Sequence, residues 1–254
     1  MQISIIQTDL FWQDKRQNLF NLDKKIDNII KTDLIILPEM FNTGFSPSSV
    51  LLAESMNGPT VAWMKERAKT KKCAIAGSLM IVEEKKYYNR LIWVTKNGRI
   101  SHYDKRHLFS LVKEEEFISR GNERLIVELE GYKICPLICY DLRFPVFSRN
   151  NVEYDMLIYV ANWPEVRIDA WNTLLKARAI ENQCYTVGVN RIGIDGNGVA
   201  FNGQSQVFDL FGTKLLGNTE NQDVVLQIET SLEDLKAKRD KTNFLKDGDG
   251  FLIQ

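Results

Sequence analysis

Short apolar runs separated by polar turns recur along the whole chain and predict many strands with a few helices between them. These runs predict strands at residues 2–8, 33–38, 73–82, 155–161, 184–190, 204–210 and 223–229. Apolar residues spaced three or four apart predict helices at 14–31 and 168–182, and a third from a cap at or near Thr60 to residue 72. Turns at 97–98 (NG) and near 130–131 (EG) predict two hairpins, over 87–103 and 124–139. Residues 231–234 (SLED) resemble a capping box and predict a short helix.

The strands at 34–37 and 156–160 are apolar on both faces, so both sides of each must be covered. Helices interspersed with strands and hairpins indicate an α/β protein with a mixed sheet under helices, and stacked sheets between helix layers would satisfy the pattern. No linker rich in Pro, Gly or Ser divides the chain. We therefore expect residues 1–254 to form a single domain. The tail over about 241–254 lacks periodicity, and is expected either to be mobile or to pack on a partner subunit.

Positive and negative side chains balance, with 33 Lys+Arg and 33 Asp+Glu. No large attraction to nucleic acid or to an anionic membrane is therefore expected. The first six residues lack a basic leader, and no apolar run approaches the roughly 18 residues of a spanning helix. The default expectation is a soluble cytoplasmic protein.

All four cysteines lie in or beside apolar runs, where a reduced thiol behaves as a small hydrophobe. Cys135 and Cys139 would lie roughly 13 Å apart on one strand, too far for a disulfide. Their spacing does not match the usual zinc pairs, and His102 and His107 are the only imidazoles in the sequence. We expect no metal site and no cofactor.

Three of the predicted strands end on reactive side chains. The run at 34–37 leads to Glu39, the run at 100–103 leads to Lys105, and the run at 133–138 leads to Cys139. A buried strand is a rigid platform, and a sharp exit from it can present one side chain to a cleft together with the backbone N–H groups that follow. The three segments together offer a base, a cation and a thiol nucleophile.

Several common catalytic motifs are absent from the sequence: G-x-S-x-G, the P-loop G-x-x-x-x-G-K-[ST] and G-x-G-x-x-G. A Cys-His pair with His107 remains formally possible. In an extended segment, however, His107 would share a face with Lys105 and compete with it for position. A structural role for His107 is the favoured interpretation.

The ordered set of segments 37–40 (LPEM), 103–109 (YDKRHLF) and 138–145 (ICYDLRFP) resembles the nitrilase, or carbon–nitrogen hydrolase, superfamily. Residues 161–164 (ANWP) and 178–182 (RAIEN) extend the resemblance over nearly the whole chain. The residues within the lysine and cysteine motifs are most similar to those of the bacterial omega-amidase branch. This resemblance implies a four-layer α-β-β-α sandwich with two mixed sheets, assembled as a homodimer.

The resemblance also implies a catalytic triad of Cys139 as nucleophile, Glu39 as general base and acid, and Lys105 as the cation facing the oxyanion. A second family glutamate lies seven residues before a glycine, and counting back from Gly121 assigns it to Glu114. Three consecutive glutamates leave the register open, so Glu115 is the alternative.

This chemistry requires only a small amide and water. A thiol titrates near 8.5, and a neighbouring ammonium is expected to lower that value. Lys105 and the backbone N–H of Tyr140 are expected to bind the oxyanion. Ammonia then leaves a thioester, which water hydrolyses. The omega-amidase resemblance suggests α-ketoglutaramate or α-ketosuccinamate as substrate; a deaminated-glutathione-like amide, an N-carbamoyl amine, a nitrile and a non-catalytic binding module remain alternatives.

Other residues have less specific interpretations. Asp141 is expected to cap the helix after the nucleophile or to pair with a basic neighbour. Arg143 is either structural or attracts a substrate carboxylate through bidentate hydrogen bonds. Phe41 and Trp163 are candidates for the wall of a substrate pocket.

Overall fold

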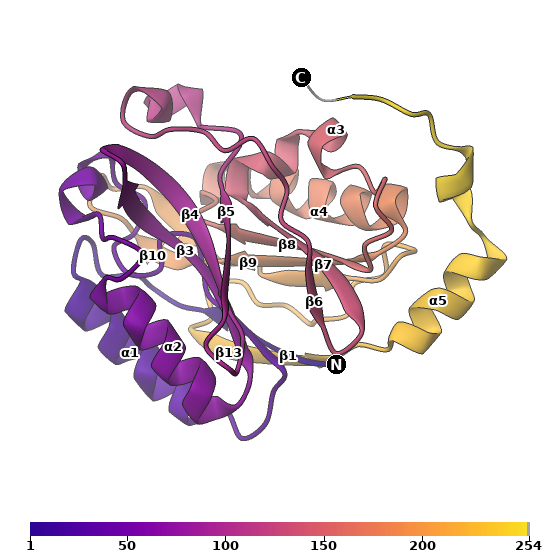
Figure 1. Ribbon diagram of the computed structural model, residues 1–254, viewed down its shortest axis with the longest axis horizontal. Helices are drawn as coiled ribbons and strands as arrows, with labels where there is room; N and C mark the ends of the chain where they lie inside the picture. The colour runs from indigo at the N-terminus through magenta and orange to yellow at the C-terminus, as the bar shows by residue number, and fades with distance from the viewer. Residues whose placement is uncertain (253–254) are drawn as a thin grey trace.

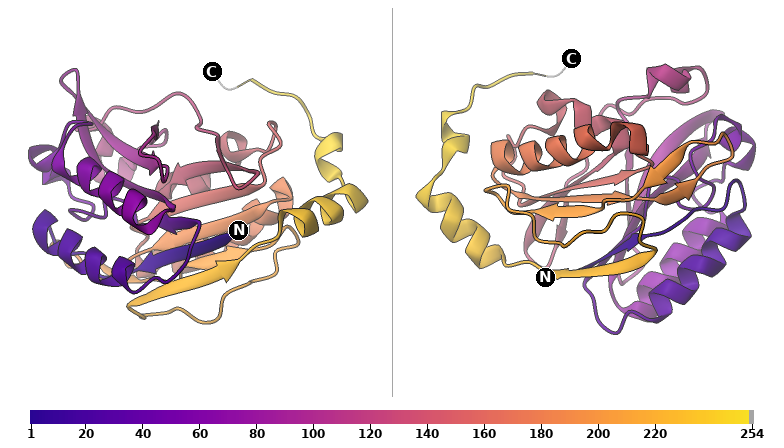
Figure 2. Two further views of the ribbon diagram at one scale, coloured as in Figure 1. Left: turned by 60° about the horizontal axis from the view of Figure 1, so that its bottom comes forward. Right: turned by 180° about the vertical axis from the view of Figure 1, so that it is seen from behind.

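Two mixed β-sheets pack face to face and helices cover their outer faces, which gives four layers in the order α-β-β-α (Figures 1 and 2). The predicted α/β class and the implied sandwich are thereby confirmed. The computed structural model describes residues 1–252, apart from the side chains of residues 47–49. The last two residues of the predicted tail lie outside this range.

The first sheet has six strands, and parallel pairing is confined to three adjacent strands near its middle. In spatial order they are β13 (Val224–Glu229), β1 (Gln2–Gln7), β2 (Leu34–Ile36), β3 (Ala74–Glu83), β4 (Lys86–Val94) and β5 (Ile100–Asp104). β4 and β5 form the predicted hairpin, whose turn contains Gly98 with a φ of 79°.

The second sheet has five strands with three parallel strands at its centre. In spatial order they are β12 (Gln206–Phe208), β9 (Tyr185–Asn190), β8 (Met156–Ala161), β7 (Tyr132–Ile138) and β6 (Val127–Leu129). β6 and β7 form the second predicted hairpin, which turns at Glu130 and Gly131. The predicted strand 204–210 is shorter than expected, and only residues 206–208 pair with β9.

Helices occupy both outer faces of the sandwich (Figure 2). Their bounds are α1 (Lys15–Asp27), α2 (Pro59–Lys71), α3 (Pro145–Ser148), α4 (Ile168–Asn182) and α5 (Leu232–Lys241). α1 and α2 bury Leu22 and Met64 against the first sheet, and α4 buries Trp171 and Leu175 against the second. Each fully buried apolar side chain of this size contributes roughly 1.5–3 kcal/mol, so these stripes fix the helices to the sheets.

The helix ends differ in detail from the sequence expectation. α1 ends at Asp27 instead of residue 31, with Asn28 as its cap. Gly58, not Thr60, is the cap residue of α2, and the N–H of Thr60 donates to Glu54 Oε2 at 2.8 Å. Ser231 caps α5 as predicted, because its side chain accepts from the N–H of Asp234 at 3.1 Å.

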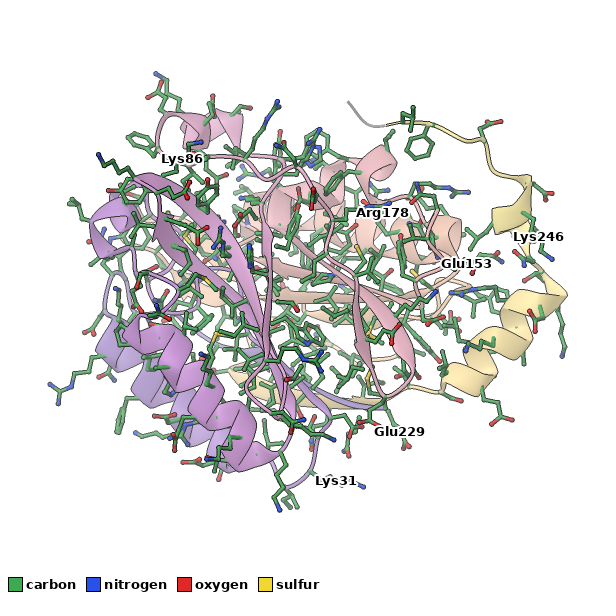
Figure 3. The ribbon with its side chains drawn as sticks, in the orientation of Figure 1. Lys31, Lys86, Glu153, Arg178, Glu229 and Lys246 are labelled. Carbon is green, nitrogen blue, oxygen red and sulfur yellow. The ribbon has the colours of Figure 1, made fainter. Side chains whose placement is uncertain are left out.

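A hairpin of β10 (Ile192–Ile194) and β11 (Ala200–Asn202) was not predicted. Short 3₁₀ turns also occur: η1 (Pro47–Leu52), η2 (Ser110–Val112), η3 (Glu114–Glu116), η4 (Cys139–Arg143), η5 (Glu165–Arg167) and η6 (Phe244–Asp247). α5 and the segment after it extend along one side of the sandwich (Figure 1). Charged side chains such as Lys31, Glu229 and Lys246 point outward (Figure 3).

Candidate active site

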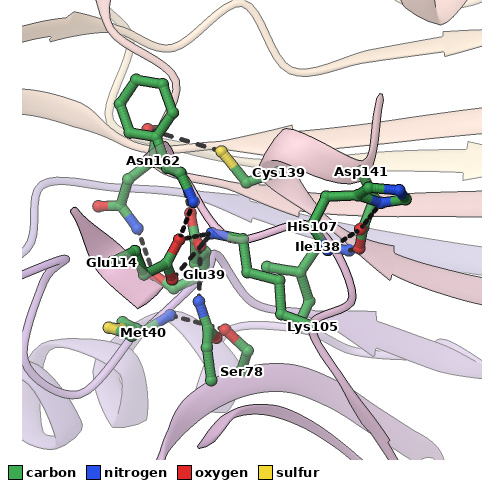
Figure 4. A network of polar contacts seen from close by, with 12 residues as sticks. Glu39, Met40, Ser78, Lys105, His107, Glu114, Ile138, Cys139, Asp141 and Asn162 are labelled. Atoms are coloured by element: carbon green, nitrogen blue, oxygen red, sulfur yellow. Dashed lines mark hydrogen bonds and ion pairs between the residues drawn. The ribbon is translucent and has the colours of Figure 1, made fainter. Parts of the chain in front are cut away.

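Four strand ends deliver polar side chains to one cavity (Figure 4). Glu39 lies just beyond β2, Lys105 directly after β5, Cys139 directly after β7 and Asn162 directly after β8. All four line a cavity of about 140 Å³. The three segments that the sequence singled out therefore converge, although they come from both sheets.

A buried ion cluster forms one wall of the cavity. The Nζ atom of Lys105 lies 3.0 Å from Glu39 Oε1 and 3.1 and 3.0 Å from the two carboxylate oxygens of Glu114. The three residues are at most 3% exposed. Burial alone would lower the pKa of Lys105, but attraction to Glu114 and Glu39 outweighs it and the pKa is raised, so the ammonium stays charged.

Of the two glutamates that the sequence left open, Glu114 is the one that lies beside Lys105. Glu114 is buried beside Lys105, and its Oε2 also accepts from the N–H of Phe109 at 2.6 Å, whereas Glu115 is exposed. Burial raises the pKa of Glu114, while the ammonium of Lys105 opposes that rise. The alternative at Glu115 does not fit this geometry.

The carboxylate of Glu39 is held by groups besides Lys105. Asn89, in the middle of β4, donates from Nδ2 to Glu39 Oε1 at 2.8 Å. The backbone N–H of Asn162 donates to Glu39 Oε2 at 2.9 Å, and the side chain of Asn162 donates to the backbone oxygen of Glu39 at 2.6 Å. Asn89 was not found by sequence reasoning, because a polar residue inside a strand gives no signal of the partner it faces.

Cys139 occupies a strained turn at the carboxyl end of β7. Its φ of 41° lies in the left-handed region, which costs a residue with a Cβ about 1–3 kcal/mol and is found mainly at functional sites. The sulfur lies 3.8 Å from the backbone oxygen of Asn162. Cys139 is partly exposed at the cavity, whereas Cys73, Cys135 and Cys184 are at most 1% exposed.

The thiol of Cys139 differs electrostatically from the sequence expectation. Lys105 does lower its pKa, but burial and the nearby carboxylate of Glu39 have the larger effect, and the pKa lies well above its ordinary value. The resting group is therefore a thiol rather than a thiolate. A thiol in this setting must lose its proton as it attacks, which requires a base within reach.

Two arginines lie on aromatic rings in the wall of the same cavity. The guanidinium carbon of Arg143 lies 4.9 Å from the ring centroid of Trp163, and that of Arg167 lies 5.4 Å from the centroid of Phe109. Within the described part of the chain, neither guanidinium has a carboxylate partner. Trp163 donates from Nε1 to the backbone oxygen of Arg167 at 2.8 Å, which ties the two stacked pairs together.

One of the residues predicted to line the pocket lies elsewhere. Phe41 is fully buried under α2 beside Trp63, at a centroid distance of 5.9 Å, and does not line the cavity. It follows Glu39 closely in sequence, but the turn at Met40, with a φ of 44°, sends its ring into the helix layer. Tyr140 lines the cavity directly after Cys139.

The unpredicted β10–β11 hairpin closes another side of the cavity. Residues of its loop and second strand line the space: Asp195, Asn197, Val199 and Phe201. Gly196 at its tip lies against the indole of Trp12, where a Cβ would approach Nε1 to 2.3 Å. The two short strands were not predicted because this segment is rich in glycine, which is a weak strand former.

The chain is similar to several known amidases. It is 41% identical to omega-amidase YafV from Escherichia coli (strain B / BL21-DE3) over 253 residues, which cover 100% of this chain and 98% of that protein. It is 33% identical to 2-oxoglutaramate amidase from Bacillus subtilis (strain 168) over 238 residues, which cover 91% of each.

The fold has close structural relatives as well. The crystal structure of XC1258 from Xanthomonas campestris, a CN-hydrolase superfamily protein with an arsenic adduct in the active site, matches with a TM-score of 0.97 at 41% identity. The match covers 100% of this chain and 99% of that one. Saccharomyces cerevisiae Nit3, a member of branch 10 of the nitrilase superfamily, shares the fold with a TM-score of 0.85 at 23% identity, over 95% of this chain and 94% of that one.

Among residues 1–252, none of the helices combines the length and the apolar composition that crossing a bilayer requires. The family model for carbon-nitrogen hydrolases matches residues 2–240, nearly the whole chain. This match and the full-length relatives confirm the resemblance that the three strand-end motifs indicated: the chain belongs to the carbon–nitrogen hydrolase family.

Proposed function

We propose that this enzyme is an omega-amidase, which hydrolyses the terminal amide of a small carboxylate-bearing substrate such as α-ketoglutaramate or α-ketosuccinamate to the dicarboxylate and ammonia. The observation that carries the proposal is the set of ionisable side chains in the cavity wall. Glu39, Lys105 and Cys139 lie in its wall together with the guanidinium groups of Arg143 and Arg167. The amidases of known name that resemble the whole chain support the same reaction.

The first half of the reaction forms a thioester. The Cys139 sulfur attacks the amide carbon while its proton passes to Glu39, and the carbonyl oxygen becomes an oxyanion. The Lys105 ammonium and the N–H of Tyr140 bind that oxyanion, each such donor being worth roughly 3 kcal/mol of barrier. Glu39 then gives the proton to the departing nitrogen, the C–N bond breaks, and ammonia leaves.

The second half hydrolyses the thioester. Glu39 takes a proton from water, the hydroxide adds to the acyl carbon, and the same donors bind the second oxyanion. The C–S bond breaks, the sulfur recovers the proton from Glu39, and the dicarboxylate is released. Glu114 assists by keeping Lys105 charged and in place, since both of its oxygens bind the Lys105 Nζ atom.

The carboxylate of the substrate would bind at the arginines. Guanidinium groups pair with carboxylates in a bidentate manner, and stacking on Trp163 and Phe109 holds each plane in a fixed orientation. A substrate bound this way extends from the arginines to the thiol, which places the amide at the far end from the carboxylate.

The experiment is ammonia release from α-ketoglutaramate by wild type and by Cys139→Ala, with a mass measurement of the acyl adduct trapped on the wild type. We expect turnover by wild type alone and an adduct on Cys139. Equal rates for the two proteins would end the proposal. A panel with a deaminated-glutathione-like amide, an N-carbamoyl amine and a nitrile ranks the other substrate classes, and failure of all of them would favour a binding module.

We further propose that the enzyme is a single-domain cytoplasmic protein that works as a homodimer. Large apolar side chains are exposed around α3, α4 and the tail, including Val146 at 57%, Ile180 at 46% and Phe244 at 63%. Exposed apolar side chains gathered on one region are typical of an interface between subunits. Sedimentation equilibrium distinguishes a dimer from a monomer directly.

A further inference from the structure

A second buried carboxylate lies beside the triad and takes no part in the proposed proton transfers. Asp141 follows Cys139 by two residues and is 0% exposed. Its Oδ2 accepts from the hydroxyl of Tyr103 at 2.7 Å and from the N–H of Ile138 at 3.0 Å. Its Oδ1 accepts from the N–H of His107 at 3.0 Å and lies 2.8 Å from His107 Nδ1 (Figure 4).

Burying a carboxylate away from water costs free energy unless its oxygens accept hydrogen bonds. Here each oxygen of Asp141 has two hydrogen-bonding partners. The bond from Ile138 fits the expectation that Asp141 is a cap, and the contact with His107 Nδ1 fits the alternative that it pairs with a basic neighbour. Apart from Ile138 N–H, the partner groups come from the segment that contains Lys105, so the carboxylate joins two parts of the active site.

The hydrogen-bond partners of Asp141 lie close to both Lys105 and Cys139 in the sequence. Tyr103 and His107 lie two residues before and two residues after Lys105, and the N–H of Arg106 donates to the Tyr103 hydroxyl at 3.0 Å. Ile138 directly precedes Cys139. A single carboxylate thus fixes the end of β5, which presents the cation, to the end of β7, which presents the thiol.

The same bonds oppose the strain at the nucleophile. The left-handed backbone of Cys139 persists only where the surrounding structure over-determines it. The bond from Ile138 N–H to Asp141 closes the η4 turn around Cys139, so loss of this bond removes a direct restraint on the strained residue.

His107 is itself held in place. Its ring stacks on Phe144 with centroids 3.8 Å apart and planes 7° apart, and meets the edge of Phe147 at 5.3 Å. Both phenylalanines follow η4. The imidazole therefore bridges the two loops through its ring and through Asp141, which agrees with the structural role expected from the sequence.

We propose that Asp141 is a positioning residue, which sets Lys105 and Cys139 at their working separation through Tyr103, His107 and Ile138. The inference rests on the proposed function for the roles of Lys105 and Cys139. It makes a separate claim, however, about what controls the reactivity of the thiol, and that reactivity is measurable without any amide substrate.

The central variant is Asp141→Asn, which keeps the shape but replaces one acceptor oxygen with a donor. We expect kcat for α-ketoglutaramate to fall about 10²-fold with KM changed less than about threefold, because a displacement near 1 Å costs about that much. Alkylation of Cys139 by iodoacetamide at pH 7 should slow at least about tenfold, since general-base assistance is worth more than that. The other three cysteines are buried, so the folded protein reports Cys139 alone.

Asp155→Asn is the matched control. Asp155 is another buried carboxylate, 4% exposed, at the opposite end of the same strands, where it accepts from Lys133 N–H at 2.9 Å and from Arg239 at 3.2 Å. We expect this variant to lose stability while kcat per folded molecule and the alkylation rate stay within about twofold of wild type. Equal kcat and alkylation losses in both variants, or in neither, would overturn the proposal.

Tyr103→Phe and His107→Gln keep the test decisive if Asp141→Asn does not fold. Each removes a side-chain partner of Asp141, and we expect each to slow alkylation and lower kcat at least about threefold. Unchanged rates in both would overturn the proposal. If wild type hydrolyses none of the amides, the alkylation rates still decide the positioning role, so the two failures remain distinguishable.

Discussion

The Nζ atom of Lys105 lies 3.0 Å from Oε1 of Glu39, although 66 residues separate the two in the sequence. Each side chain is 1% exposed. Removing one partner of a buried ion pair leaves an uncompensated charge, which typically costs about 3–5 kcal/mol. A variant that lacks one partner therefore loses stability as well as a group of the proposed chemistry, and variants must be compared per folded molecule.

Glu114 should affect catalysis where its neighbour Glu115 does not. Glu114→Gln removes one of the two negative charges that keep the Lys105 pKa high, and it weakens the bonds that hold the ammonium. We expect kcat to fall about 10²-fold, the size of effect seen when an oxyanion donor is lost. Glu115→Gln changes an exposed carboxylate of the same turn and should stay within about twofold of wild type in steady-state ammonia release. The reverse order would show that the register is wrong.

Arg143 and Arg167 should matter only for substrates with a carboxylate. Arg143→Met and Arg167→Met each remove a charged donor from the cavity wall, and hydrogen bonds to charged groups are worth about 1.5–3 kcal/mol. We expect kcat/KM for α-ketoglutaramate to fall about 10- to 150-fold in each variant.

The control for these variants is a neutral amide of similar length. Its kcat/KM should change less than about threefold, because it presents no carboxylate to the guanidinium groups. Arg120→Met, at an exposed position, should leave both substrates unaffected. Equal losses on the charged and the neutral amide would assign the arginines to the shape of the cavity instead of to substrate charge.

Strand ends were the most informative feature of the sequence. The ends of the apolar runs before Glu39, Lys105 and Cys139 can be recognised from the sequence alone. A strand that is apolar on both faces must be buried, and the polar residues that follow it mark where it ends. The helix at 168–182 was likewise predicted with the bounds that the structure shows.

Contacts between distant segments were not visible in the same way. Asn89 faces Glu39 from the middle of β4, and the alternation of the strand does not say which residue lies opposite. Phe41 was misplaced because the turn at Met40 reverses the direction of the side chain. The sign of the Cys139 pKa shift depends on the balance among burial, Glu39 and Lys105, which only the folded geometry determines.

Stability should fall in alkaline solution, because a thiol that is buried in the folded protein loses its proton first in the unfolded chain. Burial raises the pKa of Cys135 from 9.0 to about 12. Between these values the unfolded chain loses the proton and the folded protein keeps it, so the free energy of unfolding decreases as pH rises. Each such group contributes a slope of up to about 1.4 kcal/mol per pH unit.

Cys135→Ala should therefore show a shallower decline of unfolding free energy between pH 9 and 12, measured by urea denaturation. Ile134→Val, at the adjacent buried position of β7, is the control: it should lower stability at every pH and keep the wild-type slope. An identical slope for Cys135→Ala and wild type would show that this thiol is not the titrating group.

Substitutions at Gly121 and Gly188 should have different effects, one on catalysis and the other on stability. A Cβ on Gly121 would lie 2.2 Å from the backbone oxygen of Asp104, directly before Lys105, and backbone atoms cannot yield cheaply. A Cβ on Gly188 would instead meet the side chain of Leu175 at 2.4 Å, where α4 crosses β9.

We expect Gly121→Ala to displace the end of β5 and lower kcat at least about tenfold, since small displacements of a catalytic group are costly. Gly188→Ala should cost about 1–3 kcal/mol of stability by overpacking, with kcat per alkylatable Cys139 unchanged. Urea denaturation and active-site titration of both variants measure the two quantities, and a loss of kcat in Gly188→Ala alone would contradict this division.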